Sequence, residues 1–133
     1  EDMASLYRAC DIYFFPSRAE AFSLSPAEAI ASNLITITSR HGGALDFCTE
    51  ENSILLDGKL CKAPASALYW LDNNTSHQKA KWFEPDKEAM VQALKYAVNN
   101  KETLKEKIKG QKENLQSKYT WSKVTDQILS YCK

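Results

Sequence analysis

The chain has 133 residues, of which 44% are hydrophobic and 26% are charged, as is typical of a soluble globular domain. Its 17 basic and 17 acidic residues balance to a formal net charge of zero, which excludes a strong electrostatic attraction to nucleic acid. No apolar run approaches the roughly 20 residues that span a bilayer, and nothing marks the chain for secretion, so we expect one cytoplasmic domain over residues 1–133.

The first part of the chain alternates helix and strand patterns. Residues 3–10 are expected to form a short helix. Residues 12–15 form an apolar run without polar alternation, which is typical of a parallel strand buried on both faces. Pro16 ends that strand, because proline cannot extend a central ladder. Further strands are expected at residues 34–38, which are rich in β-branched side chains, and at residues 54–56.

Helices are expected between these strands. Ser25, Pro26 and Glu28 fit a capping box, with Ser25 at the N-cap and Glu28 at the third helical position. Asn33 favours a left-handed stop, and a second short helix is expected near residues 44–49. Strands that alternate with helices over short connections predict an α/β fold, with a parallel sheet and helices on both faces.

The second half of the chain has a different pattern. Residues 57–82 are expected to be an irregular insertion, with a helix around 65–71 and an exposed loop at 73–81. Residues 85–133 are expected to form the C-terminal helices: 85–99, then 101–119 with a break at Gly110, and a last helix.

Aromatic residues mark the expected packing of this half. Thr120 caps the last helix, on one face of which fall Trp121, Val124, Ile128 and Tyr131. The three tryptophans, Trp70, Trp82 and Trp121, are expected to pack against the rest of the protein.

Metal binding is not indicated by the cysteines and histidines. The cysteines are widely and irregularly spaced, at Cys10, Cys48, Cys61 and Cys132. The two histidines lie 36 positions apart, and no Cys-x-x-Cys pair is present. Metal ligands usually come in close pairs, so we expect reduced thiols and no metal site.

Two acids flank the start of the second expected helix. Glu20 and Glu28 lie eight positions apart, with the helix start between them. Carboxylates accept hydrogen bonds from hydroxyl groups, and the free N–H groups at a helix N-terminus bind phosphate. A strand, a turn and a helix start with such acids indicate a site for a phosphorylated ligand. Two alternatives stay open: Glu28 as the capping partner of Ser25, and Glu20 as a solvated loop acid.

A set of motifs, in this order and spacing, resembles one known family. They lie at residues 6–18, 42–46, 51–56 and 119–122. Glu20 and Glu28 also match a Glu-x7-Glu motif. Together they resemble the retaining glycosyltransferases of family four, which have the GT-B architecture. The resemblance covers residues 3–57 well and residues 82–132 loosely.

The resemblance implies a Rossmann-like parallel sheet that forms the later part of a GT-B C-terminal domain. The implied activity is transfer of a sugar from a nucleotide-diphosphate sugar to a saccharide or lipid-linked acceptor, with retention of configuration, in glycan, polysaccharide or glycolipid biosynthesis. The acceptor would be held by an N-terminal domain outside this chain, so the chain alone is expected to be inactive. No metal or other cofactor is implied, and a peripheral membrane association of the complete protein stays open.

The resemblance also implies roles for individual residues. Glu28 would bind the ribose hydroxyls, and Glu20 would be the catalytic residue that faces the donor sugar. The remaining donor-binding residues would be the loop and helix start, Ala21, Phe22, Ser23, Leu24 and Ser25, with Gly42 and Gly43 beside them. Arg18 either supplies a positive charge to the donor phosphates or forms a surface ion pair.

Two departures from the family leave other interpretations open. Ala21 and Ser23 stand where the family usually has glycine, so that side chains crowd the expected donor site. The chain is therefore also interpreted as a non-catalytic interaction module on the same fold. A sugar-nucleotide epimerase or a sugar phosphorylase with this architecture is the remaining alternative.

Overall fold

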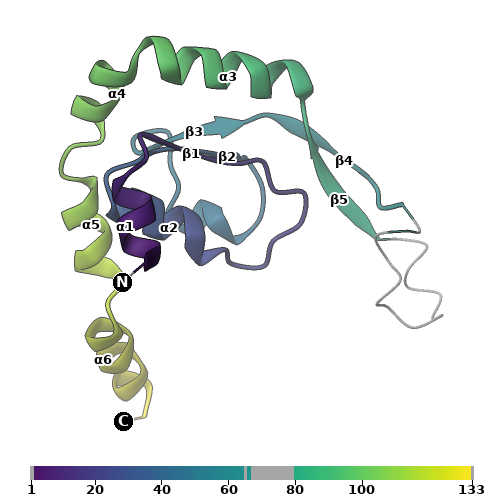
Figure 1. The fold of residues 1–133 in the computed structure, drawn as a ribbon. Coiled ribbons are helices and arrows are strands. Elements are labelled where there is room, and N and C mark those ends of the chain that lie inside the picture. The colour runs from purple at the N-terminus through teal and green to yellow at the C-terminus, as the bar shows by residue number, and fades with distance from the viewer. Residues whose placement is uncertain (1, 65, 67–79, 133) are drawn as a thin grey trace.

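The computed structural model describes residues 2–64, 66 and 80–132, and these residues form an α/β fold (Figure 1). The elements, in chain order, are α1 (Asp2–Arg8), β1 (Ile12–Phe15), α2 (Leu24–Ala31), β2 (Ile35–Ser39), the 3₁₀-helix η1 (Gly43–Asp46), β3 (Ser53–Leu56), β4 (Gly58–Lys62), β5 (Lys81–Pro85), α3 (Lys87–Asn99), α4 (Lys101–Lys107), α5 (Gln111–Lys118) and α6 (Trp121–Tyr131). The expected helix at 65–71, apart from residue 66, and most of the expected loop at 73–81 lie outside the described residues, as does Trp70.

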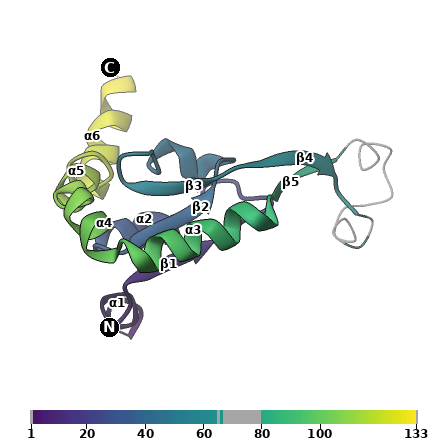
Figure 2. The same ribbon diagram turned by 90° about the horizontal axis from the view of Figure 1, so that it is seen from above.

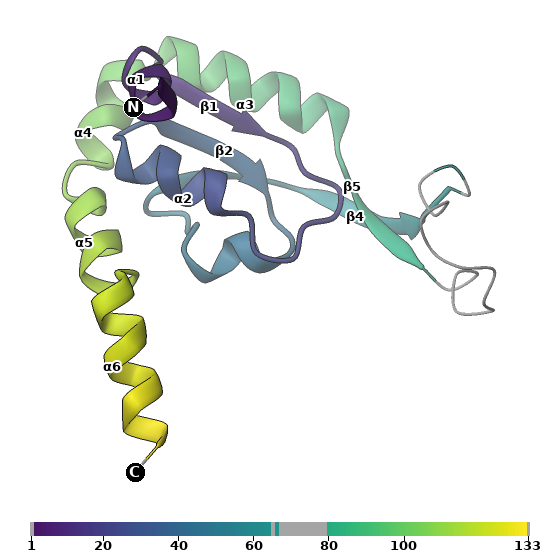
Figure 3. The ribbon, with the colours of Figure 1, turned by 60° about the horizontal axis from the view of Figure 1, so that its bottom comes forward.

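A three-stranded parallel sheet with the order β1-β2-β3 forms the centre of the fold. β1 pairs with β2 from Ile12 opposite Ile35, and β2 pairs with β3 from Thr36 opposite Ser53. Helices cover both faces, since α3 runs along one face and α2 lies on the other (Figures 1 and 3). The predicted fold class, a Rossmann-like parallel sheet between helices, is confirmed.

A hydrophobic core lies on each face of the sheet, and β2 contributes to one of them through Ile35 and Ile37. Ile35 and Ile37 pack with Leu56 and with residues of α3 and α4, among them Ala97 and Leu104. Each fully buried aliphatic side chain of this kind stabilises the fold by about 1.5–3 kcal/mol. On the opposite face, a second cluster joins α2, η1 and the residues after it: Ile30, Ala44, Phe47 and Cys48. All five residues of β2 are buried, which identifies it as the central strand.

β1 is more exposed than its apolar sequence predicted. Its residues are half-buried, except for Phe14, which is 36% exposed. Within the described part of the chain, β1 pairs with β2 alone, so one of its edges has no neighbouring strand. The expectation that residues 12–15 are buried on both faces is therefore wrong.

The segment expected to be irregular is regular at both of its ends. β4 and β5 pair in antiparallel fashion, from Gly58 opposite Pro85 to Lys62 opposite Lys81. This two-stranded hairpin stem continues from β3, projects away from the sheet, and returns the chain to α3 (Figure 2). The expectation of irregular structure over 57–82 is wrong at these strands, whose pairing partners lie too far apart in sequence for a local pattern to indicate them.

The C-terminal helices begin and end close to the predicted positions. The Asp86 side chain caps α3 by accepting a 2.9 Å hydrogen bond from the Ala89 amide. Gly110, with φ 85°, separates α4 from α5, and Thr120 caps α6 through the Lys123 amide. The expectation that Trp121 packs against the protein is wrong, because it is 86% exposed. Among the helices that the structure describes, none is both long enough and apolar enough to cross a bilayer.

Candidate functional site

The loop between β1 and α2, residues 16–23, carries Glu20 at the carboxyl end of β1. The loop turns at once, because the Ser17 amide donates a 2.9 Å hydrogen bond to the Phe15 carbonyl. The Ser39 hydroxyl, at the end of β2, donates a hydrogen bond to the Ser17 carbonyl. Glu20 itself is exposed to solvent. The loop is therefore anchored at its start and presents a solvent-exposed carboxylate.

Gly42 and Gly43 lie against this loop. A Cβ atom on Gly42 would lie 2.8 Å from the Glu20 carbonyl oxygen. A Cβ atom on Gly43 would overlap the Ala21 carbonyl oxygen and lie 2.9 Å from the Phe22 Cα. Such separations are shorter than real Cβ contacts, so only glycine permits this approach. The structure thus brings Glu20, Ala21 and Phe22 together with Gly42 and Gly43, and the glycines make room for the chain's own backbone.

The helix that follows begins earlier than predicted. The N-cap of α2 is Ser23, not Ser25, and Ser23 has a left-handed conformation with φ 65° and makes no capping hydrogen bond through its side chain. Pro26 is then the third helical residue, where its missing N–H costs nothing because the first four N–H groups have no intrahelical partner. The predicted capping box is wrong. Leu24 and Ser25 become the first two helical residues.

Glu28 lies in α2 beyond the first turn and is exposed. Its Oε2 atom accepts a 3.1 Å hydrogen bond from the hydroxyl of Tyr7 in α1. Tyr7 is 8% exposed and packs with Ala29 and Leu34. Burial raises the pKa of Tyr7 to about 12. The carboxylate of Glu28 adds to this shift, because it accepts a hydrogen bond from the protonated phenol and its negative charge disfavours the phenolate.

Sequence reasoning missed Tyr7 as a partner of Glu28. The helix expected at residues 3–10 contains Tyr7 but says nothing about the partner of its hydroxyl. The two residues are 21 positions apart, and a strand and a loop lie between them. Only the packing of α1 against the end of the sheet brings them together. A buried tyrosine generally needs a hydrogen-bond partner, and this is the one available sequence signal.

A cavity of about 220 Å³ lies beside Glu28, between α2 and α5. Its walls are mainly apolar and are formed by Phe22, Leu24, Ala27, Ala31, Phe47, Leu115 and Tyr119. Gln116 and Glu28 are the polar residues of the lining. The Phe22 ring meets the Phe47 ring edge to face, with a centroid separation of 5.5 Å. Phe22 and Leu24 nevertheless remain 44% and 64% exposed, so they form an open apolar rim next to a carboxylate.

Arg18 is engaged by the hairpin stem. Its guanidinium group makes two hydrogen bonds to Glu84, of 2.7 and 2.8 Å, and lies 4.9 Å from the centre of the Trp82 ring. The pair raises the pKa of Arg18 and lowers the pKa of Glu84, since each charge favours the ionised form of the other. Of the two roles that the sequence left open for Arg18, the surface ion pair is the one the structure contains.

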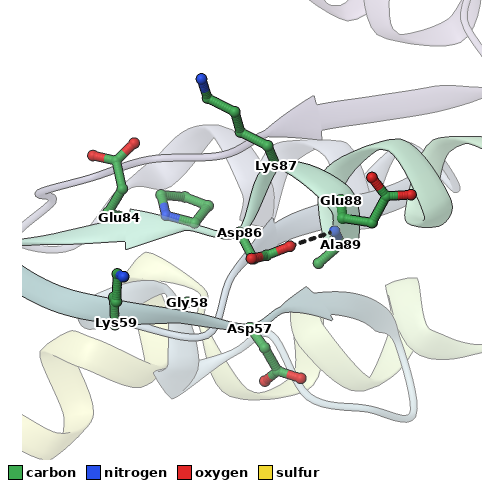
Figure 4. A pocket seen from close by; sticks show the side chains of 9 residues that line it. Asp57, Gly58, Lys59, Glu84, Asp86, Lys87, Glu88 and Ala89 are labelled. Carbon is green, nitrogen blue, oxygen red and sulfur yellow. Dashed lines mark hydrogen bonds between the residues drawn. The ribbon is translucent and has the colours of Figure 1, made fainter.

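A larger cavity, of about 770 Å³, lies at the base of the hairpin stem (Figure 4). Its lining includes the acids Asp57, Glu84, Asp86 and Glu88. Figure 4 shows the side chains of Asp57 and Glu84 pointing in opposite directions, while Asp86 bonds the Ala89 amide. Within the described ranges, no group of three His, Cys, Asp or Glu side chains is arranged to hold a metal ion. The absence of a metal from the working protein stays a prediction.

Together, the parallel sheet and the acid-flanked loop and helix after its first strand define a Rossmann-like α/β domain. Residues 1–79 match the family described as "Glycosyl transferases group 1". The chain belongs to this family, and the resemblance noted in its motifs is confirmed.

Three curated relatives show the same likeness at modest identity. The chain is 42% identical over 59 residues to D-inositol 3-phosphate glycosyltransferase of Corynebacterium kroppenstedtii. The aligned residues cover 44% of this chain and 13% of the relative. It is 36% identical over 77 residues to GDP-mannose-dependent alpha-mannosyltransferase of Corynebacterium glutamicum, covering 56% of this chain and 19% of the relative. A mannosylfructose-phosphate synthase of Agrobacterium fabrum is 42% identical over 43 residues, 32% of this chain and 10% of the relative. The chain therefore matches only a small part of each relative.

Proposed function

We propose that this chain is the donor-binding part of a retaining glycosyltransferase that moves a sugar from a nucleotide-diphosphate sugar to a saccharide or lipid-linked acceptor. One observation carries the proposal. In a chain of this family, an exposed carboxylate precedes α2, a second lies within it, and two glycines support the intervening loop. The acceptor is held elsewhere in the complete protein, so the chain alone does not catalyse transfer.

Glu28 binds the ribose hydroxyls of the donor in this proposal. Tyr7 already occupies Oε2, which leaves Oε1 to accept hydrogen bonds from the ligand. A hydrogen bond from a hydroxyl to an ionised carboxylate contributes about 1.5–3 kcal/mol, because the acceptor is charged. The bond from Tyr7 also holds the carboxylate in one orientation before the ligand arrives. The apolar cavity beside Glu28 offers space for a neighbouring part of the nucleoside.

Glu20 and the loop after it face the donor sugar in this proposal. The carboxylate of Glu20 accepts hydrogen bonds from sugar hydroxyls, and the backbone of Ala21, Phe22 and Ser23 lines the site. The amides of Leu24 and Ser25, the first two helical residues, point toward the distal phosphate. Amides at a helix start lack intrahelical acceptors and carry partial positive charge, so they suit an anion.

The proposed reaction leaves the configuration at the anomeric carbon unchanged. The acceptor hydroxyl attacks from the face that the diphosphate leaves, and a phosphate oxygen takes the proton. The main task of the protein is then to stabilise the charge on the departing diphosphate. The start of α2 supplies part of that stabilisation without a metal. Arg18 adds no free charge while Glu84 holds it.

Nucleotide binding tests the proposal. GDP and UDP are the probes, and GDP is included because the name of one relative specifies GDP-mannose. Calorimetric titration of the chain is expected to show binding that Glu28→Gln weakens by about tenfold or more, because one charge-assisted hydrogen bond is lost. Glu113→Gln, at an exposed position of α5, is the matched control and leaves the affinity unchanged.

In the complete protein, the two acids are expected to have separable effects. Glu28→Gln raises the KM for the donor, because it removes a contact to the ribose in the ground state. Glu20→Ala lowers kcat, because it removes a group at the reacting sugar. Unchanged donor kinetics in both variants would contradict the proposed site.

A further inference from the structure

The hairpin stem formed by β4 and β5 touches the loop that carries Glu20. The amide of Phe83 in β5 donates a 2.8 Å hydrogen bond to the carbonyl of Arg18, two residues before Glu20. Through this bond the backbone of the loop pairs with the edge of β5. The loop and the stem are therefore joined through the main chain, whatever side chains they carry.

Three side-chain contacts reinforce this junction. Glu84 holds the guanidinium of Arg18 through two hydrogen bonds, and a bidentate geometry restricts the direction of both side chains. The Trp82 ring lies under the same guanidinium, at 4.9 Å from its central carbon. The Arg18 side chain is thus held by Trp82 and Glu84 of β5, and its backbone carbonyl is bound by the intervening residue, Phe83.

The stem also reaches the other side of the loop. The ring of Phe83 is 6% exposed and stacks on the ring of His41, with a centroid separation of 5.2 Å and an angle of 11°. His41 directly precedes Gly42 and Gly43, against which the backbone of Glu20 and Ala21 lies. Consequently β5 contacts both the loop that carries Glu20 and the turn that supports it.

We propose that the base of the hairpin stem is a brace for the donor loop, in which Arg18, Trp82 and Glu84 position Glu20. This inference rests on the proposed function, because it gives the braced loop the donor as its ligand. Arg18 is a positioning residue here: it acts on the donor through the loop and not through its own charge. The stem lies between the family motifs at residues 51–56 and 119–122 and contains none of them.

Exchanging the two charges tests the brace. Arg18→Glu and Glu84→Arg are made singly and together in the full chain. Hydrogen exchange is followed at the Phe83 amide, because this amide is protected by its bond to the Arg18 carbonyl. Loss of an ion pair this exposed to solvent is expected to raise the equilibrium constant for local opening by about two- to fivefold. Each single variant also adds repulsion, because it places two like charges together. Exchange of the Phe83 amide therefore rises by about fivefold in each single variant, and the double variant returns it to within about twofold of the starting rate.

Hydrogen exchange of the β2 amides distinguishes a local effect on the donor loop from a loss of stability of the whole fold. Their exchange is expected to stay unchanged in all three variants, because β2 is central and is paired with β1 and β3. Glu106→Gln is the matched control: it breaks an exposed ion pair between Glu106 in α4 and Lys109 just after this helix, and it leaves exchange of the Phe83 amide unaffected. Unchanged exchange of the Phe83 amide in the single variants overturns the proposal. A rise that appears equally in β2, or that the double variant does not reverse, also overturns it.

Binding of GDP and UDP to the same variants links the brace to the ligand. A looser loop is expected to lower the affinity of both single variants, and the double variant is expected to restore it. Failure of the unaltered chain to bind either nucleotide contradicts the proposed function, while the exchange rates still decide whether the stem holds the loop. Normal nucleotide affinity in variants whose Phe83 amide exchanges faster overturns the positioning role of Arg18.

Discussion

The Tyr7 hydroxyl donates a 3.1 Å hydrogen bond to Oε2 of Glu28, which joins α1 to α2 across 21 positions of sequence. The two partners differ in environment, since the tyrosine is buried and the glutamate is exposed. A substitution at Tyr7 therefore changes the surroundings of Glu28 and leaves the carboxylate itself in place. Four predictions follow from this bond and from the backbone around it.

Tyr7→Phe keeps the ring in its core but removes the hydrogen bond. We expect the free energy of unfolding to fall by about 0.5–1.5 kcal/mol, because Glu28 is solvated and regains water as its partner. Urea denaturation measures this change. Tyr96→Phe removes a hydroxyl from a tyrosine that is 52% exposed in α3, and it should stay within about 0.5 kcal/mol of the original protein. Equal losses in the two variants would show that the bond to Glu28 contributes nothing.

Tyr7 should also make stability depend on alkaline pH. Its pKa is raised from 10.0 to about 12, because burial and the neighbouring carboxylate disfavour the phenolate. A raised pKa in the folded state means that the contribution is fully present below pH 10.0 and is lost as the pH rises toward about 12. Unfolding free energies measured across this window should fall less steeply in Tyr7→Phe. Parallel curves for the two proteins would argue against the shift.

Ser23→Gly and Ala21→Gly restore the family's usual glycines and should have opposite effects. Ser23 has φ 65°, a conformation that costs a non-glycine residue about 1–2 kcal/mol. Ser23→Gly is therefore expected to stabilise the chain by about 0.5–1 kcal/mol, once the greater freedom of glycine in the unfolded chain is subtracted.

Ala21 is the internal control, because it is not among the described non-glycine residues with positive φ. Ala21→Gly relieves no strain in the folded state. It is expected to lower the free energy of unfolding by about 0.4–1 kcal/mol, because glycine gives the unfolded chain more conformational freedom. Thermal unfolding of both variants gives the comparison. A change of the same sign in both would mean that Ser23 carries no backbone strain.

Gly42→Ala should be much more damaging than Gly110→Ala. Both glycines have positive φ, 81° and 85°. Gly42 combines this φ with ψ −173°, a region that is essentially limited to glycine, and its added Cβ would press on the Glu20 carbonyl. Gly110 has a left-handed conformation with ψ −10°, and a Cβ there meets nothing within 4 Å.

We expect a loss of about 1–2 kcal/mol for Gly110→Ala, from backbone strain alone. Gly42→Ala should cost at least about 2 kcal/mol more, because strain and overlap act together. Chemical denaturation measures both losses, and nucleotide titration of Gly42→Ala reports the displaced loop. Similar losses for the two substitutions would contradict the close packing of Gly42 against Glu20.

The local elements could be predicted from the sequence because their signals lie within a few residues of each other. Asn33, at the end of α2, has the left-handed conformation that its side chain tolerates, with φ 59°. Thr120 and Gly110 mark the ends of the C-terminal helices at the expected places. The parallel order of the sheet followed from alternation of strands and helices over short connections.

Only the tertiary structure decided where α2 begins. The motif at Ser25 and Glu28 satisfies every local requirement of a capping box, but the loop before it is pressed against Gly42 and Gly43. The helix starts from Ser23 instead, and Glu28 is left to accept a hydrogen bond from Tyr7. A capping preference of about 1 kcal/mol is smaller than the effect of overlapping backbone atoms, so the packing of the loop prevails.

The sequence by itself therefore determined the order of the elements, the family motifs and the two acids at the start of α2. The tertiary structure decided the surroundings of those acids: the hydroxyl beside Glu28, the glycines under Glu20, and the stem that holds Arg18. The physical reason is distance along the chain. Caps and periodic patterns depend on neighbouring residues, whereas Arg18 and Glu84 are 66 positions apart and meet only because the sheet, the loop and the stem fold together.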